Sequence, residues 1–129
     1  SSYVTGIGGG VITNGQVVHG AGMGGELGHT IAVKNGRPCG CGASGCLERY
    51  ASASAVKNIC LEKLKDEKWA RSILHNVDTA ALSSKDVVDA ANKGDALGML
   101  ILEETAEILG LACVNFLRCF DPERIVMVQ

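Results

Sequence analysis

Residues 24–48 of the chain are GGELGHTIAVKNGRPCGCGASGCLE. This stretch brings three cysteines, Cys39, Cys41 and Cys46, into eight consecutive residues, and His29 precedes them. Three thiolates and one imidazole are a ligand set that suits tetrahedral zinc, and glycines between the ligands let the backbone wrap around one ion. The spacing favours a metal site, with a disulfide framework and a loop of free thiols as the alternatives.

Two carboxylates flank the cysteine loop. Residues 1–45 contain 14 of the 17 glycines and only three charged side chains. Glu26 lies in this stretch and Glu48 lies just beyond it, so few charged residues surround them in the sequence. Carboxylates in such surroundings commonly accept paired hydrogen bonds from neighbouring hydroxyl groups of a polyol. We interpret Glu26 and Glu48 as candidate ligand contacts, whereas Glu62 and Glu67 are expected to be solvated surface residues.

Residues 5–10 are TGIGGG, a glycine cluster between a predicted strand at residues 3–5 and a predicted hairpin. Glycine lets the main chain approach an anion closely, and successive amide groups in such a turn can form a phosphate-binding nest, with the Thr5 hydroxyl as a further donor. The cluster matches neither the Walker lysine motif nor the dinucleotide-binding fingerprint. Taken alone, it fits a tight structural turn equally well.

Two turns are predicted in the glycine-rich part of the chain. Asn14-Gly15 lies between residues 11–13 and residues 16–18, and it predicts a hairpin, because this dipeptide supplies positive φ at both central positions of a type I′ turn. A further short strand is expected over His29–Val33, followed by a turn at Asn35-Gly36.

The pattern becomes helical after residue 50. Apolar side chains recur at i, i+3, i+4 and i+8, which predicts an amphipathic helix with one buried stripe. A second, shorter helix is expected to begin after Ser83 or Ser84 and to end at Gly94. The stripe of the first helix consists of Val56, Ile59, Cys60 and Leu64.

A longer helix is predicted to begin at Asp95 and to run to about Arg118, and Asp121-Pro122 closes it. Its second half, residues 109–117, is apolar nearly all round, so we expect it to be deeply buried. Residues 125–128 are Ile-Val-Met-Val, and we expect them to form a terminal strand.

Composition limits the class of protein. A chain of 129 residues with 47% hydrophobic side chains suits one domain with a modest core. The net charge of -2 gives no electrostatic footprint for nucleic acid, and no apolar run approaches the roughly 18 to 20 residues of a membrane-spanning helix. Cys60 and Cys113 fall on apolar helix faces, as ordinary buried thiols do, which argues against disulfides. Because residue 1 is not Met and both ends have strand character, we expect a piece of a longer protein.

Three motifs, TGIGGG, GGELGH and CGCGASGCLE followed by YASASA, resemble in order and spacing the ROK family of sugar kinases and sugar-responsive repressors. The resemblance continues through KDVVDAANKGD to DPERIVMV and covers essentially the whole chain. It implies an α/β fold, an actin-like ATPase lobe of the ribonuclease H type with a mixed sheet, packed helices and a zinc-binding loop. Residues 1–50 would supply the hairpin, the sugar contacts and the zinc loop, and residues 51–129 the helices and a terminal strand.

The resemblance also implies a role for each motif. ATP, used with Mg²⁺, would have its phosphates near Thr5, Gly6, Gly8 and Gly9. A structural zinc ion would be bound by His29, Cys39, Cys41 and Cys46. Sugar hydroxyls would be contacted by Glu26, His29 and Glu48. His29 can serve both sites, because an imidazole has two ring nitrogens.

The function implied by the resemblance is that of an ATP-dependent hexose or N-acetylhexosamine kinase, which phosphorylates the sugar 6-hydroxyl. The family's catalytic aspartate lies upstream of the glycine cluster, so we expect the chain alone to be inactive. The alternatives are the sugar-sensing domain of a ROK repressor and a purely structural zinc module. The resemblance further implies a cytoplasmic homo-oligomer, and we expect no membrane partner and no nucleic acid bound by this segment.

Overall fold

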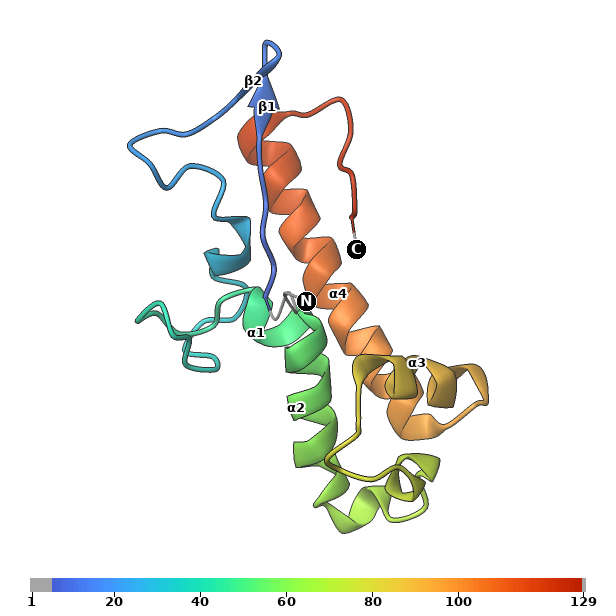
Figure 1. Ribbon diagram of the computed structural model, residues 1–129. Helices are drawn as coiled ribbons and strands as arrows, with labels where there is room; N and C mark the ends of the chain where they lie inside the picture. Colours follow the sequence, from blue (N-terminus) through green and yellow to red (C-terminus); the bar gives the residue numbers. More distant parts are fainter. Residues whose placement is uncertain (1–5, 129) are drawn as a thin grey trace.

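The computed structural model describes residues 6–128, so Thr5 and the strand predicted at residues 3–5 lie outside the described residues. One long helix runs along the molecule, shorter helices pack near its N-terminal end, and a hairpin projects at the top of the view (Figure 1). The elements are β1 (Ile12–Thr13), β2 (Gln16–Val17), the 3-10 helix η1 (Leu27–His29), α1 (Glu48–Ala51), α2 (Ala53–Leu64), the 3-10 helices η2 (Glu67–Trp69) and η3 (Ile73–Asn76), α3 (Ser84–Asn92) and α4 (Ala96–Phe120).

The hairpin predicted around Asn14-Gly15 is confirmed. β1 and β2 pair antiparallel with Ile12 opposite Val17, and the ladder is extended by a 2.8 Å hydrogen bond from the Val18 amide to the Val11 carbonyl. Asn14 and Gly15 have φ angles of 51° and 72°, the pair of left-handed conformations that a type I′ turn requires. The hairpin carries exposed apolar side chains, since Ile12 is 72% accessible.

The strand predicted over His29–Val33 is wrong. His29 ends η1, and only Ile31 forms a β-bridge, to Cys46. A longer ladder does not form because the opposing segment is the tightly turned cysteine loop rather than an extended strand. The following turn is confirmed: Asn35 has a φ of 54°, and the Gly36 amide donates to the Val33 carbonyl.

The hydrophobic core lies where α2, α3 and the first half of α4 meet. The stripe predicted for α2 is confirmed, because Val56, Ile59 and Cys60 are buried and Leu64 packs against them while partly exposed. A fully buried aliphatic side chain contributes on the order of 1.5–3 kcal/mol, so this cluster is the main source of stability in the helical part. Its other buried members are Leu74, Leu82, Val87, Ala90, Leu97 and Ile101.

Helix α3 begins and ends as the sequence predicts. Ser83 is its N-cap, and the Ser83 amide donates a 2.8 Å hydrogen bond to the Asp86 carboxylate in a capping box. Gly94 follows the helix with a φ of 85°, the left-handed conformation that commonly ends a helix. The next residue, Asp95, therefore stands at the point where the chain turns into α4.

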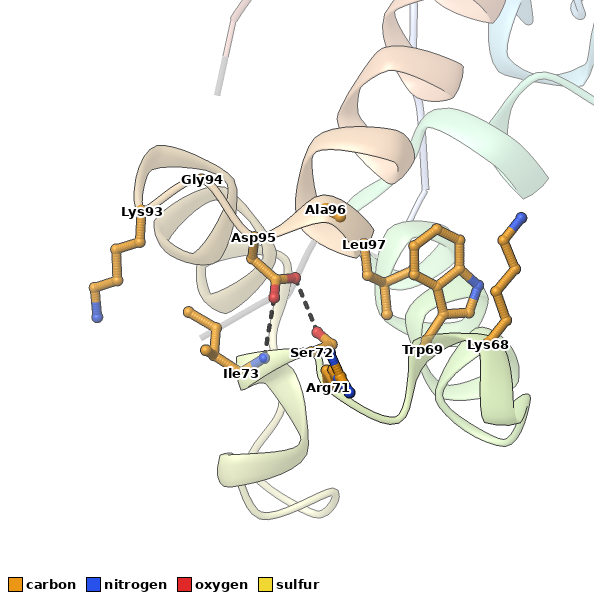
Figure 2. A pocket seen from close by; sticks show the side chains of 10 residues that line it. All are labelled: Lys68, Trp69, Arg71, Ser72, Ile73, Lys93, Gly94, Asp95, Ala96 and Leu97. Carbon is orange, nitrogen blue, oxygen red and sulfur yellow. Dashed lines mark hydrogen bonds between the residues drawn. The ribbon is translucent and has the colours of Figure 1, made fainter.

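Asp95 ties the start of α4 to the loop that precedes α3. As N-cap, its carboxylate accepts a hydrogen bond from the Gly98 amide at 3.0 Å. It also accepts from the Ser72 hydroxyl at 2.8 Å and from the Ile73 amide at 3.0 Å (Figure 2). Burial raises the pKa of Asp95, but the hydrogen bonds together lower it by more than burial raises it. The pKa of Asp95 therefore lies below its usual value. The ionised carboxylate is therefore the form that stabilises this junction.

Residues 109–117, in the second half of α4, were expected to be deeply buried, and this prediction is wrong for most of them. Ala112 is buried, but Leu111, Val114 and Leu117 are 64%, 50% and 46% accessible. Cys113, expected to be a buried thiol, is only partly covered. No element among residues 6–128 packs over this whole apolar surface, so an apolar composition alone does not bury it.

The sheet content is also smaller than expected. Residues 125–128 form no strand, and Val128 is 87% accessible, because a strand requires a partner backbone and this segment has none among the described residues. Within residues 6–128 the only sheet is the β1–β2 hairpin, so the mixed sheet is not present there and the α/β content is strongly weighted to helix. In the part of the chain that the structure describes, no helix has the length and apolar character needed to cross a membrane.

We expect Asp95→Asn to lower the free energy of unfolding at pH 7 by about 1–2 kcal/mol, because an amide NH₂ group replaces one of the two charged oxygens that accept the hydrogen bonds from Ser72, Ile73 and Gly98. A carboxylate with a lowered pKa stabilises the fold above its unfolded pKa, about 3.9, and this contribution disappears as pH falls through the folded pKa. The difference between the variant and the wild type should therefore shrink at pH 3. Denaturant unfolding at both pH values measures it, with exposed Asp89→Asn on α3 as the control. A difference independent of pH would contradict the assigned role.

Candidate functional site

The glycine segment, η1 and the start of α1 lie close together. A side chain at Gly28 of η1 would clash with the Ile7 carbonyl, and one at Gly9 would come within 2.7 Å of the Leu27 side chain. A Cβ at Gly6 would lie 2.5 Å from the Glu48 carboxylate, at the first residue of α1. The clash with backbone at Gly28 requires glycine, and all three contacts bring the cluster predicted to bind phosphates next to a predicted ligand contact.

The cysteine loop is closed by backbone hydrogen bonds between its two sides. The Gly45 amide donates to the Arg37 carbonyl at 2.7 Å, and the Cys39 amide donates to the Ala43 carbonyl at 2.9 Å. Pro38 and Ser44 form a β-bridge between these bonds. The loop therefore folds back on itself.

The loop is also fastened to the segment that follows η1. The Gly45 carbonyl accepts hydrogen bonds from the amides of Ala32 and Val33, at 2.8 and 3.2 Å. Gly45 has a φ of 87°, and a side chain there would clash with the Val33 carbonyl. The next residue, Cys46, is fully buried. Only glycine can combine the positive φ at position 45 with the absence of a side chain that would meet Val33.

The four predicted metal ligands are brought together by this fold. One donor atom from each of His29, Cys39, Cys41 and Cys46 lies within 4.8 Å of the others. The His29 Nδ1 atom is 3.6 Å from the Cys39 Sγ atom, and the Cys41 and Cys46 Sγ atoms are 3.5 Å apart. Zinc bonds of about 2.0–2.3 Å in a tetrahedron place neighbouring donors roughly 3.5–3.8 Å apart, so these two distances fit such an ion and the four residues could hold one.

The thiols differ in their surroundings. Burial and the neighbouring thiols raise the pKa of Cys46 to about 12, whereas a hydrogen bond with the Ala43 backbone lowers the pKa of the exposed Cys41. Metal ligation requires the thiolate form, so binding at Cys46 would displace a proton at neutral pH.

His29 and Glu48 form a pair on the opposite side of the imidazole. The His29 Nε2 atom lies 2.9 Å from Glu48 Oε1, and the two side chains are 35% and 19% accessible. With Nδ1 facing Cys39, both ring nitrogens have partners, and the carboxylate fixes the orientation of the ring. The Ser52 hydroxyl donates to the Glu48 carbonyl and helps to end α1. The pair borders the glycine segment and is accessible enough to meet a ligand.

The Glu26 carbonyl accepts a 3.1 Å hydrogen bond from the His29 amide, but the Glu26 side chain is not paired with His29 or Glu48. This side chain is exposed, and its carboxylate forms no hydrogen bond or ion pair with any of residues 6–128. Glu67 is also exposed, as expected. Glu62 is exposed as predicted, but it is not simply solvated, because it pairs with Arg37.

This ion pair and a tyrosine hydroxyl are features that the sequence reasoning missed. The two guanidinium nitrogens of Arg37 donate to the two carboxylate oxygens of Glu62 on α2, at 2.8 and 2.7 Å. The pair lowers the pKa of Glu62 and raises that of Arg37. The Arg37 amide donates to the Tyr50 hydroxyl at 2.7 Å. The one available signal was that Arg37 is the only arginine in the glycine-rich part of the chain.

Comparison with known proteins gives a consistent result. The sequence profile described as the ROK family matches residues 2–128. A glucokinase from Halalkalibacterium halodurans is 39% identical over 125 residues, which are 95% of this chain and 38% of that protein. The DNA-binding transcriptional dual regulator NagC of Escherichia coli is 34% identical over 123 residues, which are 95% of this chain and 29% of that protein.

The structural comparison agrees with the sequence comparison. The crystal structure of a ROK family glucokinase from Streptomyces griseus in complex with glucose and AMPPNP matches with a TM-score of 0.77 and 30% identity. The match covers 92% of this chain and 39% of the glucokinase chain. The chain thus spans well under half of the length of the relatives it matches.

We expect Gly45→Ala to destabilise the cysteine loop by more than about 2 kcal/mol, because left-handed backbone costs a side chain roughly 1–2 kcal/mol before the clash with Val33 is added. Gly40→Ala is the matched control in the same loop, since a side chain there meets no atom within 4 Å. Amide hydrogen exchange of residues 32–46 in both variants measures the effect. Equal protection in the two variants would contradict the close crossing at Gly45.

Proposed function

Because this chain belongs to the ROK family, we propose that the protein containing it is an ATP-dependent kinase of a hexose or N-acetylhexosamine. The observation that carries the proposal is the placement of the partly accessible His29–Glu48 pair beside the glycine segment. A carboxylate and an imidazole suit sugar hydroxyls, and the exposed glycines at positions 8–10 leave the backbone open to close approach by phosphates. The two reactants would then meet at this edge of the chain. The 39% identity to a glucokinase supports the same activity.

In this proposal the chain's residues bind and orient the reactants. Glu48 and Glu26 accept hydrogen bonds from sugar hydroxyls, and a hydroxyl that approaches His29 shares the Nε2 atom with Glu48, whose Oε1 atom lies 2.9 Å away. The Glu26 carboxylate is exposed and has no ion pair with the described residues. Gly6, Gly8 and Gly9, with Thr5, lie near the phosphates of ATP, and Mg²⁺ neutralises phosphate charge. The γ-phosphoryl group passes to the sugar 6-hydroxyl, whose proton goes to a carboxylate supplied from outside this chain.

The donor set of His29, Cys39, Cys41 and Cys46 holds a structural zinc ion in this proposal. Four protein ligands complete a tetrahedron and leave no position for an activated water, so the metal's role is to fix the loop and the His29 ring. Both the sugar contact and the metal then depend on one imidazole, with Nε2 facing Glu48 and Nδ1 facing Cys39.

A sugar-responsive repressor is the second candidate, because NagC is 34% identical over nearly the whole chain. A repressor would have the same sugar and zinc contacts as the kinase, but sugar binding would have a different consequence. A repressor would bind sugar without turning over ATP and would change its affinity for DNA through a separate domain.

The full-length protein should phosphorylate at least one of glucose, mannose, N-acetylglucosamine and N-acetylmannosamine when ATP and Mg²⁺ are present. A coupled assay of ADP formation measures this activity, and calorimetric titration of each sugar measures binding separately. Sugar binding without turnover, together with sugar-dependent release of operator DNA, would favour the repressor and contradict the kinase.

Glu48→Gln should weaken sugar binding by roughly ten- to a hundredfold, the cost of losing a charged acceptor from a partly buried hydrogen bond. Zinc content, measured by elemental analysis, should stay near one ion per chain, because Glu48 is not among the four ligands. Removing zinc with a chelator should lower sugar affinity far more than nucleotide affinity. Exposed Glu67→Gln is the control. Unchanged sugar binding in Glu48→Gln would place Glu48 outside the sugar site.

A further inference from the structure

We propose that Tyr50 and the Arg37–Glu62 ion pair are positioning residues for the metal and sugar site, acting as a brace that holds the cysteine loop against α1 and α2. We call these three residues the loop brace. This inference rests on the proposed function, because it concerns how the proposed metal ligands and sugar contacts are held in position relative to one another. None of the three residues is itself a metal ligand or a proposed sugar contact.

The first part of the brace acts through the Arg37 backbone. The Arg37 carbonyl accepts the hydrogen bond from Gly45, directly before Cys46, while Arg37 itself stands two residues before Cys39. Its amide donates to the Tyr50 hydroxyl. One residue thus joins both sides of the loop and attaches them to α1, so the loop cannot slide along α1 without breaking that bond.

The second part of the brace is the position of Tyr50 within α1. Tyr50 lies two residues after Glu48 in the same helix, so a bond at its hydroxyl fixes the loop relative to the helix that carries the sugar contact. The packing is close, because a side chain at Gly36 would clash with the Tyr50 hydroxyl. The distance between His29, whose Nδ1 atom faces the loop, and Glu48, which belongs to α1, is therefore sensitive to this one hydroxyl.

The third part is the two-pronged contact between Arg37 and Glu62. Two parallel N–H···O bonds fix the plane of the guanidinium group, which a lysine ammonium cannot reproduce. The guanidinium carbon also lies 5.8 Å from the centre of the Tyr50 ring. The side chains of Arg37 and Glu62 are 34% and 54% accessible, so the pair contributes little to overall stability. Its geometry points to orientation of the loop.

The direct test is Tyr50→Phe, which removes only the hydroxyl and leaves the partly buried Arg37 amide without its acceptor. Zinc affinity, measured by competition with a chelator, should fall about tenfold, and sugar KM in the full-length protein should rise by a similar factor with kcat less affected. The visible spectrum of the Co²⁺-substituted protein should change, because it reports the geometry of the four donors. Amide exchange at Arg37 and Gly45 should accelerate.

Arg37→Lys separates charge from geometry, and it should resemble Tyr50→Phe rather than the wild type. The matched control is Lys63→Gln, which removes a different ion pair of α2, that between Lys63 and Glu104 at 3.7 Å. The control should leave zinc affinity, the Co²⁺ spectrum and exchange in the loop unchanged.

Wild-type zinc affinity and wild-type exchange in both Tyr50→Phe and Arg37→Lys would overturn the brace. Losses of zinc affinity that merely follow a lower unfolding temperature, and that Lys63→Gln reproduces, would also overturn it. If the wild-type protein binds no zinc, the metal part of the proposed function fails; faster exchange at Arg37 and Gly45 in Tyr50→Phe still supports the brace, and unchanged exchange overturns it.

Discussion

The crossing of the backbone at Gly45 and Val33 is the constraint on which the site depends. The Gly45 carbonyl receives two amides from the segment after η1, and its own amide reaches Arg37 across the loop. His29 belongs to the first of these segments and the three cysteines to the second, so this crossing is what brings an imidazole and three thiols from different parts of the chain to one place. Because the crossing requires both a positive φ and the absence of a side chain, only glycine suits position 45. The bridge between Ile31 and Cys46 and the hydrogen bond from the Leu47 amide to the Thr30 carbonyl hold the same two segments together.

The parts of the structure that the sequence predicts well are those determined by local chemistry. Asn14-Gly15 specifies its turn through backbone conformation alone, and the caps at Ser83 and Asp95 follow from side chains that bond to their own helix ends. The apolar stripe of α2 is also predicted locally, because the periodicity of apolar residues shows which helix face is buried, whichever element covers it. The closeness of the three cysteines also follows from their short spacing on a glycine-rich loop, whereas His29 joins them through the crossing at Gly45 and Val33.

The parts that the sequence did not predict depend on contacts between distant residues. Arg37 and Glu62 are 25 residues apart, and no local pattern links an arginine in a glycine-rich loop to one particular glutamate on a later helix. The expectation for residues 109–117 failed for a related reason. Apolar composition states that a surface avoids water, but only a neighbouring element can cover it, and residues 6–128 supply none for Leu111 or Val114. The strand expected at residues 125–128 likewise needs a partner that the described residues lack.

The two ring nitrogens of His29 link the proposed metal site to the proposed sugar contact. Nδ1 faces Cys39 while Nε2 faces Glu48, so a neutral imidazole that gives its Nδ1 lone pair to a metal must carry its proton on Nε2. That proton then points at the Glu48 carboxylate, and the second carboxylate oxygen stays available to a hydroxyl group. A metal at the thiolates would fix the tautomer, the tautomer would fix the direction of the hydrogen bond, and the hydrogen bond would fix the acceptor that a sugar meets. Each step in this series depends on the one before it, beginning with the cysteine loop. The geometry at Gly45, which holds that loop, therefore affects the Glu48 carboxylate on α1.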